Sequence, residues 1–456
     1  MGNELQEKLD ELAGELEVPG VAAGVYLDGE EIYAFHGVTS VENPLPVDEN
    51  TQFQFGSTGK TFTATAVLRL VEEGKVELDA PVRSYVPELT LKDSEAAEKV
   101  TVLQLFNHTA GWDGDFIHDT GNGDDALARY VELMATIDQV SPLGATVSYN
   151  NASLSLAGRL IEKATGKTYE TAMRELVLDP LGLEETLFFP NDVMTRRFVV
   201  GHTRHEDGHV TINRPWDLPR SAYPAGGMSA PAREQIAWAR FHLGDGTAPD
   251  GTRVLSQELL QKMKEPTADM RGSALGDYVG ISWLLRELDG ERLVSHGGTT
   301  NGQYSDFHMV PSRNFAVISM ANCGPNGSEL NHLLSKWSFE HYLGLSEKEP
   351  EFLSLSDEAL APYIGQYETI AALCTITAEG GRLFAKAEPK PEMVAVLGEQ
   401  DDEPPIPLAL VEGEGDPYVV PEGPAKGMRG YFRRDADGRV DAVHLGGRLA
   451  ERVRSA

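Results

Sequence analysis

Ser57 and Lys60 are the pair of residues in this chain that most directly suggests chemistry. They lie just before a run with helical periodicity, so we expect Ser57 at or near a helix N-terminus, where side chains three positions apart are neighbours. A serine hydroxyl needs a neighbouring base at neutral pH, and Lys60 could provide it if burial lowers the pKa of its amine. Such a pair is also expected about once by chance in a chain of this length, and Lys60 would then be an ordinary solvated lysine.

A second candidate group is the segment from Tyr149 to Asn151. Tyr149 could relay a proton to or from the serine or a leaving group. Asn151 could hydrogen-bond Lys60 and a substrate amide carbonyl, because its side chain has both donors and an acceptor. Taken alone, a tyrosine two positions before an asparagine at a turn is more typical of a capped loop with a packed ring.

The third group is the run His296, Gly297, Gly298 and Thr299, which ends a strand-like segment. Two glycines beside a strand allow a substrate backbone to approach closely. The amide of Thr299 could pair with the amide of Ser57 as an oxyanion hole. His296 would add a hydrogen bond and, when protonated, a positive charge. The alternative is an edge-strand histidine beside a bulge.

Together and in this order, the three groups resemble the serine β-lactamase and penicillin-binding-protein superfamily, whose members carry Ser-x-x-Lys, then Tyr-x-Asn, then a Lys/His-x-Gly strand. Residues 103–111 are similar to its Leu-Leu-x-His-Thr-Ser-Gly element, and residues 224–229 to its Pro-Ala-Gly-Gly-x-x-Ser element. The resemblance covers about residues 10–345. Residues 360–367 and 430–432 look like the lipocalin-like barrel that is appended to many of these hydrolases.

The resemblance implies a two-step acyl transfer. Ser57 would attack a carbonyl, Lys60 and Tyr149 would shuttle the proton, and water would release the acyl group. Which of Lys60 and Tyr149 is the base stays open. The residues expected to bind the substrate or stabilise the oxyanion are Asn151, His296, Gly297, Gly298 and Thr299. No metal and no cofactor are expected.

The supporting segments are interpreted as structural. His108 is expected to brace a loop beneath the active site, because Lys60 and Tyr149 already account for proton transfer. Gly226 and Gly227 are expected to meet a backbone constraint. Trp112 could line the substrate cleft or simply pack.

One departure from the family pattern bears on the substrate. Many β-lactamases and transpeptidases have a lysine where His296 stands, and its permanent charge helps to hold a carboxylate, whereas a histidine near neutral pH offers a partial charge. We therefore expect a serine hydrolase for esters or amides, that is, a carboxylesterase or a D-amino-acid-type peptidase or amidase, with at most weak β-lactamase activity. Two alternatives stay open: a non-catalytic protein that binds acyl-peptides or cell-wall fragments, and an acyltransferase or macrocyclase with the same site.

The elements that position these residues follow from hydrophobic periodicity. Strand-like runs at both ends of the first 345 residues, with helices between them, predict an α/β fold whose first and last strands share one sheet. The resemblance adds that this sheet is antiparallel and flanked by helices, with an all-helical region. The clearest expected helices are residues 61–73 and 232–243, and the clearest strands are residues 21–26, 31–37, 293–295, 304–310 and 315–321.

Composition divides the chain into three segments. We expect a catalytic domain over residues 1–345, a linker over 346–355 and a small antiparallel barrel over 356–456. The charged, helix-breaking stretch Ser346–Pro350 marks the boundary. After it, short apolar runs alternate with glycine, proline and Asp-Gly turns, a pattern that favours a barrel.

The overall composition is that of an ordinary soluble protein, with 456 residues, 41% of them hydrophobic, and a formal net charge of -32. That charge argues against binding to nucleic acid or an anionic membrane, and we expect a small ester or peptide substrate as partner. Cys323 and Cys374 match no metal spacing and are expected to be free, buried thiols. We find no signal peptide and no membrane span, so we expect a cytoplasmic protein, or a secreted one if a signal has been removed. The oligomeric state stays open.

Overall fold

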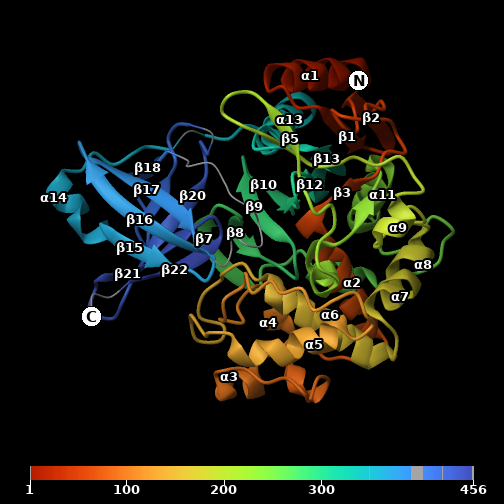
Figure 1. Ribbon diagram of the computed structural model, residues 1–456, viewed down its shortest axis with the longest axis horizontal. Coiled ribbons are helices and arrows are strands. Elements are labelled where there is room, and N and C mark those ends of the chain that lie inside the picture. The colour runs from red at the N-terminus through yellow and green to blue at the C-terminus, as the bar shows by residue number, and fades with distance from the viewer. Residues whose placement is uncertain (1, 349, 392–403, 424, 454–456) are drawn as a thin grey trace.

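The computed structural model describes residues 2–348, 350–391, 404–423 and 425–453 (Figure 1). These residues form one antiparallel sheet with helices on both faces, a helical region, and a closed barrel that is blue in Figure 1. The barrel lies beside β7 (Ala268–Ser273), the edge strand of the sheet. The expected fold class is confirmed, including the C-terminal barrel.

The sheet has the strand order β2-β1-β13-β12-β10-β9-β8-β7, with β11 paired to β12. Val21 of β1 lies opposite Ala321 of β13, so the first and last strands do share one sheet. The other strands of this sheet are β1 (Gly20–Leu27), β2 (Glu30–Gly37), β8 (Gly276–Val279), β9 (Leu284–Leu288), β10 (Glu291–Ser295), β11 (Gly298–Thr299), β12 (Tyr304–Val310) and β13 (Phe315–Ala321). Short pairings join β3 (Phe53–Gln54) to β6 (Ser229–Ala230), and join β4 (His202–Arg204) to β5 (Val210–Ile212) and β14 (Cys323–Gly324).

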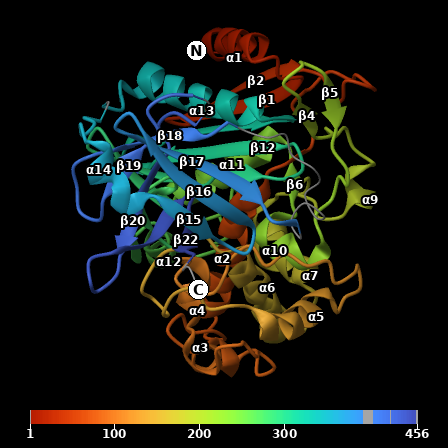
Figure 2. The same ribbon diagram turned by 60° about the vertical axis from the view of Figure 1, so that its left-hand side comes forward.

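Helices cover both faces of the sheet. Alternate residues of β1 pack with the leucines of α1 (Gly2–Glu15), whereas Ala22 belongs to the core on the other face. The helix α13 (Asn326–Ser338) lies on the same face as α1 (Figure 2). The helix α11 (Ala232–Leu243) packs against β1 and β13 from the opposite face. Successive side chains of a strand point to opposite faces, so both faces of the sheet are buried.

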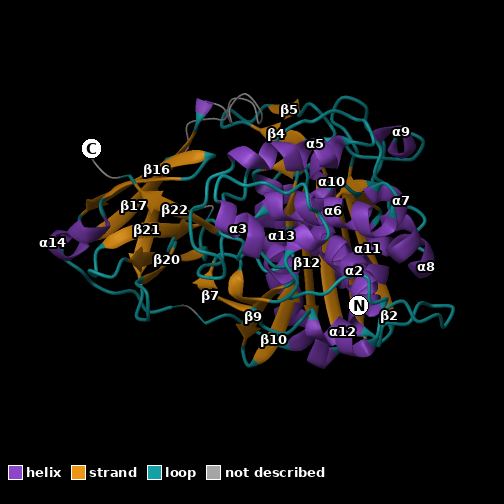
Figure 3. Cartoon of the chain, turned by 90° about the horizontal axis from the view of Figure 1, so that it is seen from below, coloured by secondary structure: helices purple, strands orange, loops and turns teal. Residues whose placement is uncertain are grey.

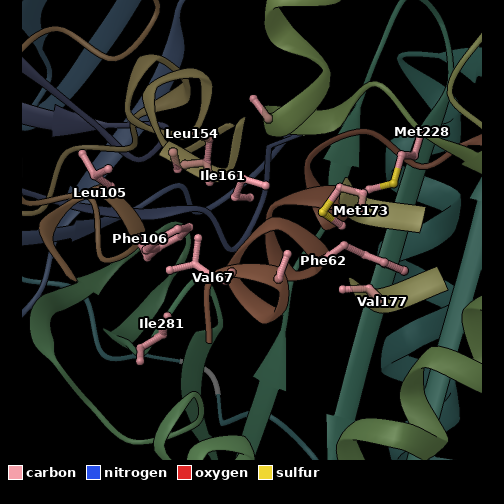
Figure 4. Close-up of a cluster of buried hydrophobic side chains, with 14 of the residues drawn as sticks. Phe62, Val67, Leu105, Phe106, Leu154, Ile161, Met173, Val177, Met228 and Ile281 are labelled. Atoms are coloured by element: carbon pink, nitrogen blue, oxygen red, sulfur yellow. The ribbon is translucent and has the colours of Figure 1, made fainter. Parts of the chain in front are cut away.

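The helix α2 (Gly59–Glu72) lies at the centre of the larger core (Figure 4). The sequence predicts a helix with one apolar face, but the structure buries almost the whole helix because α6, α10 and α11 pack around it. Its threonines tolerate this burial because their hydroxyls find acceptors. Thr61 Oγ1, for example, donates to the carbonyl oxygen of Thr58 at 2.7 Å. Phe62 stacks on Trp238 of α11 with ring centroids 3.7 Å apart.

The helical region lies in front of the sheet when the molecule is seen from below (Figure 3). Its main helix, α6 (Asn151–Thr165), is capped at its start by Asn150, whose side chain accepts from the amide of Ser153, and at its end by Gly166 in the left-handed conformation. The remaining helices are α3 (Ser94–Lys99), α4 (Val102–Phe106), α5 (Ala126–Leu133), α7 (Tyr169–Met173), α8 (Asp179–Leu181), α9 (Pro190–Val193), α10 (Tyr223–Gly226), α12 (Gln257–Lys262) and α14 (Asp357–Leu360).

The described residues of the C-terminal part form an eight-stranded barrel that closes where β15 pairs with β22. Its interior is filled by large side chains such as Tyr367, Tyr418 and Phe432. Its strands are β15 (Gly365–Glu368), β16 (Ala372–Glu379), β17 (Arg382–Pro389), β18 (Ile406–Leu410), β19 (Pro417–Val419), β20 (Arg429–Arg434), β21 (Val440–Leu445) and β22 (Arg448–Arg452).

Two smaller expectations can be compared with this fold. Cys323 and Cys374 are free and buried, as expected. Within the described part of the chain, the helices are too short or too polar for any of them to span a membrane.

Replacing Phe62 by alanine should destabilise the protein by about 3–5 kcal/mol, because it removes a buried ring and leaves a cavity beside Trp238. Chemical denaturation followed by tryptophan fluorescence would measure the loss. The exposed Leu45, which is 54% accessible, provides the control. Its alanine variant should stay within about 0.5 kcal/mol of the wild type, and equal effects of the two changes would contradict the prediction.

Candidate active site

Ser57 lies in a single helical turn, Gly56–Thr58, that leads directly into α2. This position at the helix start is the one the sequence predicts. Gly56 has a φ of 51°, and a Cβ there would lie 2.7 Å from the amide nitrogen of Thr299. A Cβ on Gly298 would lie 2.0 Å from the carbonyl oxygen of Phe55. Glycine at both positions therefore lets β11 lie directly against the turn that carries Ser57.

Two hydroxyls fix the sheet to this turn. Thr58 Oγ1 donates to the carbonyl oxygen of His296 at 2.9 Å. Ser305 Oγ, on β12, donates to the carbonyl oxygen of Phe55 at 2.8 Å. Both bonds are buried, so they hold the Ser57 turn in register with the strand that follows His296.

Lys60 lies beneath Ser57 and is fully buried. Its Nζ is 2.9 Å from Ser57 Oγ and donates to the carbonyl oxygen of Ala225 at 2.7 Å. Burial holds the pKa of this amine well below its ordinary value, the positive charge of Arg448 acts in the same direction, and the negative charge of Asp115 opposes both. The amine thus contacts two neutral oxygens in a dry environment that favours its uncharged form.

Tyr149 completes the group around the serine. Its ring is buried, with its centroid 4.9 Å from Lys60 Nζ, and its hydroxyl forms a side-chain hydrogen bond with Ser57. Burial raises the pKa of this phenol, and the bond to Ser57 only partly offsets the effect. The pKa of Tyr149 therefore moves in the opposite direction from that of Lys60, and the phenol stays protonated near neutral pH.

His108 braces the loop beside Tyr149, as expected, and of the two possibilities left open for Trp112 the structure shows packing. His108 adopts a φ of 58°, and its Nδ1 accepts the amide of Asn150 at 3.1 Å. Trp112 is fully buried, and its Nε1 donates to Oδ1 of Asn150 at 3.2 Å. These contacts brace the loop that carries Tyr149. Gly226 also meets a backbone constraint, because a Cβ there would lie 2.8 Å from the carbonyl carbon of Gly56.

Asn151 lines the cleft, but its amide has a different partner from the one expected. Its Nδ2 donates to Oδ1 of Asp115 at 3.0 Å, and the hydrogen bonds of the described residues include none between Asn151 and Lys60. The buried carboxylate of Asp115 is a stronger acceptor than the neutral amine of Lys60 and draws the Asn151 donor toward it. The expected hydrogen bond to Lys60 is therefore wrong for this structure.

His296 directly follows β10 and is buried, with 2% of its surface exposed. Its Nδ1 lies 2.7 Å from the carbonyl oxygen of Gly297. Burial lowers the pKa of His296 to about 3, and Lys60, when protonated, acts in the same direction. The ring is therefore neutral at physiological pH. The partial positive charge expected of His296 is incompatible with this environment, because the hydrogen bond to Gly297 only partly compensates the loss of hydration.

A cleft of about 740 Å³ opens over Ser57. The predicted site residues that line it are Ser57, Tyr149, Asn151, His296, Gly297, Gly298 and Thr299. Lys60 lies below its floor. The rest of the lining is largely apolar and includes Phe116, Tyr130 and Leu218. Within the described residues, no group of histidine, cysteine, aspartate and glutamate side chains could hold a metal ion.

Three contributors to the site escape the sequence analysis. Arg448, in the turn that begins β22 of the barrel, lines the cleft and binds Asp115 through Nε at 3.0 Å and Nη2 at 3.1 Å. Its guanidinium also lies 4.8 Å from the ring centroid of Tyr149. Ala225 contributes only its backbone carbonyl. Asp115, Arg448 and the carbonyl group of Ala225 lie in three distant segments, and no sequence motif identifies any of them as a site residue.

A protein-family model described as Beta-lactamase matches residues 5–334. The chain belongs to the Beta-lactamase family. It is 34% identical to Penicillin-binding protein 4 of Amycolatopsis lactamdurans over 372 residues, which cover 80% of this chain and 96% of that protein. The family and this relative make the chain a serine hydrolase of the β-lactamase and penicillin-binding-protein type, as the sequence resemblance implied.

Solved structures of this fold match the chain either with or without the barrel. The structure of SurE with D-Leu has 25% sequence identity and a TM-score of 0.76, and the match covers 99% of both chains. The D-amino acid amidase from Ochrobactrum anthropi SV3, complexed with L-phenylalanine amide, has 25% identity and a TM-score of 0.59 over 73% of this chain and 95% of that chain.

In a Beta-lactamase family member with this geometry, Lys60→Arg should slow acylation of Ser57 by about 10²–10⁴-fold, because arginine keeps the charge but does not release its proton. The rate of labelling by a fluorophosphonate would measure this. In the wild type that rate should rise with pH as Lys60 loses its proton and level off well below the ordinary lysine value of 10.5. Lys75, which pairs with Glu73 at the surface, is the control, and Lys75→Arg should label normally.

Replacing Gly298 by alanine should reduce acylation about a hundredfold while leaving the protein folded, because the new methyl group forces β11 away from the Ser57 turn. Gly14→Ala is the matched control, since nothing lies within 4 Å of a Cβ at that position. Comparing labelling rates with thermal unfolding would separate a local shift from loss of the fold. Normal labelling of the Gly298 variant would contradict the close approach of β11.

Proposed function

We propose that this serine hydrolase cleaves ester or amide bonds through an acyl intermediate on Ser57, as a D-amino-acid-type peptidase or amidase or as a carboxylesterase. The observation that carries the proposal is the buried amine of Lys60, 2.9 Å from Ser57 Oγ. A neutral amine in contact with a hydroxyl can accept its proton as the oxygen attacks a carbonyl. A binding protein without catalysis has no need of a lysine buried without an anionic contact.

The opposite pKa directions of the two candidate bases support separate roles for them. Lys60, whose pKa is lowered, takes the proton of Ser57 as the bond from Oγ to the carbonyl carbon forms. Tyr149, whose pKa is raised, donates its proton to the nitrogen or oxygen of the leaving group. The proton that Lys60 has taken up then passes to Tyr149 and restores its phenol. A water molecule then attacks the acyl-serine and releases the acid.

The backbone around Ser57 supports an oxyanion hole of two amides. A Cβ on Gly298 would lie 2.7 Å from the amide nitrogen of Ser57, and a Cβ on Gly56 would lie 2.7 Å from that of Thr299. The two amides thus belong to segments in direct contact at the floor of the cleft. Rigid donors of this kind stabilise the charge that develops on a carbonyl oxygen.

The substrate class rests on the cleft and on the comparisons. The amidase is named for D-amino acids and SurE was solved with D-Leu, which favours acyl donors of this configuration. The apolar lining fits a hydrophobic side chain. His296 is neutral, so it offers no permanent charge for the carboxylate of a β-lactam. β-Lactamase activity should accordingly be weak.

A substrate panel tests this proposal. We expect turnover of a D-phenylalanine amide and of a nitrophenyl ester, slower turnover of the matching L-amide, and the slowest hydrolysis of a chromogenic cephalosporin. Ser57→Ala should lower kcat/KM by about 10⁴-fold or more, because the nucleophile is lost. Ser346→Ala, at an exposed position before the barrel, is the control and should be unaffected.

Mass spectrometry distinguishes the proposal from its alternatives. A covalent adduct of the acyl group on Ser57 in the wild type supports an acyl intermediate. Substrate binding without such an adduct and without turnover would indicate a binding protein. An adduct that is released mainly to an added amine would indicate an acyltransferase and contradict the assignment as a hydrolase.

A further inference from the structure

The turn between β21 and β22 of the barrel is bonded to the segment that carries Tyr149. The amide of Tyr149 donates to the carbonyl oxygen of Gly447 at 2.9 Å. The amide of Leu449 donates to Ser148 Oγ at 3.1 Å. His444 Nε2 lies 3.1 Å from the carbonyl oxygen of Val147, completing a continuous contact between the barrel and this segment. The backbone position of Tyr149 therefore depends on the barrel.

Arg448 extends this contact into the cleft. It binds Asp115 with two parallel hydrogen bonds, and its Nη1 donates to the carbonyl oxygen of Gly446 at 3.1 Å. Asp115 in turn holds the amide of Asn151. The guanidinium stacks over Tyr149, on whose ring Lys60 also lies. One side chain of the barrel thus contacts Tyr149 directly and orients Asn151 through Asp115.

The charges that face Lys60 and Tyr149 are few. Arg448 is the nearby cation and Asp115 the nearby anion. His108 and His296 also face the centre, and burial keeps both neutral. A second carboxyl, that of Asp113, accepts the amide of Ile370 from the barrel at 2.8 Å, and burial raises its pKa. The balance of charge at the centre therefore depends on the pair formed by Arg448 and Asp115.

We propose that Arg448 is a positioning residue through which the barrel completes the active site: it holds Asp115 and Tyr149 in place and balances the carboxylate of Asp115 next to Lys60. This inference rests on the proposed function, in that it takes Ser57 as the nucleophile and Lys60 as its base. The centre needs both parts of the chain, because a buried carboxylate without its cation would favour the protonated form of Lys60.

The test is the pH dependence of labelling of Ser57 by a fluorophosphonate in the full-length protein. Labelling requires neutral Lys60, so its rate rises with pH through a midpoint that belongs to the coupled centre. Arg448→Gln leaves Asp115 unbalanced and should move this midpoint up by on the order of one pH unit. Asp115→Asn leaves Arg448 unbalanced and should move the midpoint down.

Two further variants separate charge from geometry. The double variant R448Q/D115N has neither charge and should return the midpoint close to that of the wild type. Arg448→Lys keeps the charge but loses the two parallel bonds, so its midpoint should stay near that of the wild type while its maximal rate falls about tenfold or more. Arg439→Gln, in an exposed turn of the barrel with 78% of the side chain accessible, is the control and should match the wild type.

Each result bears on the inference. Equal midpoints in R448Q, D115N and the wild type, or shifts in the same direction, would overturn it. If Arg448→Gln fails to fold, the downward shift in D115N and the unshifted midpoint of R448K still decide the matter. A wild-type protein that the fluorophosphonate does not label would contradict the proposed function itself, and the inference would fall with it. Normal labelling with unshifted variants contradicts the inference alone.

Discussion

The contact between the buried amine of Lys60 and the hydroxyl of Ser57 is the interaction on which the rest of the site depends. An ammonium group in this position would lose its hydration and contact two neutral oxygens, and the negative charge of Asp115 would only partly offset that loss. The surrounding helices impose this environment, because α2 lies inside the core rather than on its surface. Chemical reactivity at Ser57 is thus a direct consequence of how the domain packs.

A second constraint is the close approach of three backbone segments around Ser57. Gly56, Gly226 and Gly298 come from the Ser57 turn, from α10 and from β11, and a Cβ on any of them would overlap backbone atoms of a neighbouring segment. The site therefore requires that a helix, a turn and a strand lie closer together than any side chain at these three positions would allow. The same approach brings the carbonyl oxygen of Ala225 to Lys60.

Sequence reasoning succeeds here where the signal is local. The predicted bounds agree with the observed ones for the strands 304–310 and 315–321 and the helix 232–243. Strand alternation and helical periodicity are patterns of consecutive residues, so the sequence alone reveals them. Ser57, Tyr149 and His296 each lie in a recognisable motif, so the sequence predicts that they belong to one site, and all three line the same cleft. The neutral state of His296 and the partner of Asn151 are misjudged, because both follow from burial and from Asp115, which only the assembled fold reveals. Arg448 has no local signal at all.

The pair of Asp115 and Arg448 has a consequence for the order in which the molecule forms. The two residues are 333 positions apart, although their side chains are in direct contact. During synthesis, the segment with Ser57, Lys60 and Tyr149 leaves the ribosome long before the barrel does, and domains fold as they emerge. Until the last barrel hairpin docks, the nascent domain carries the carboxylate of Asp115 beside Asn151 without the guanidinium that binds it. The hydrolase fold can thus form first, and its cleft is completed only later, when the barrel adds Arg448.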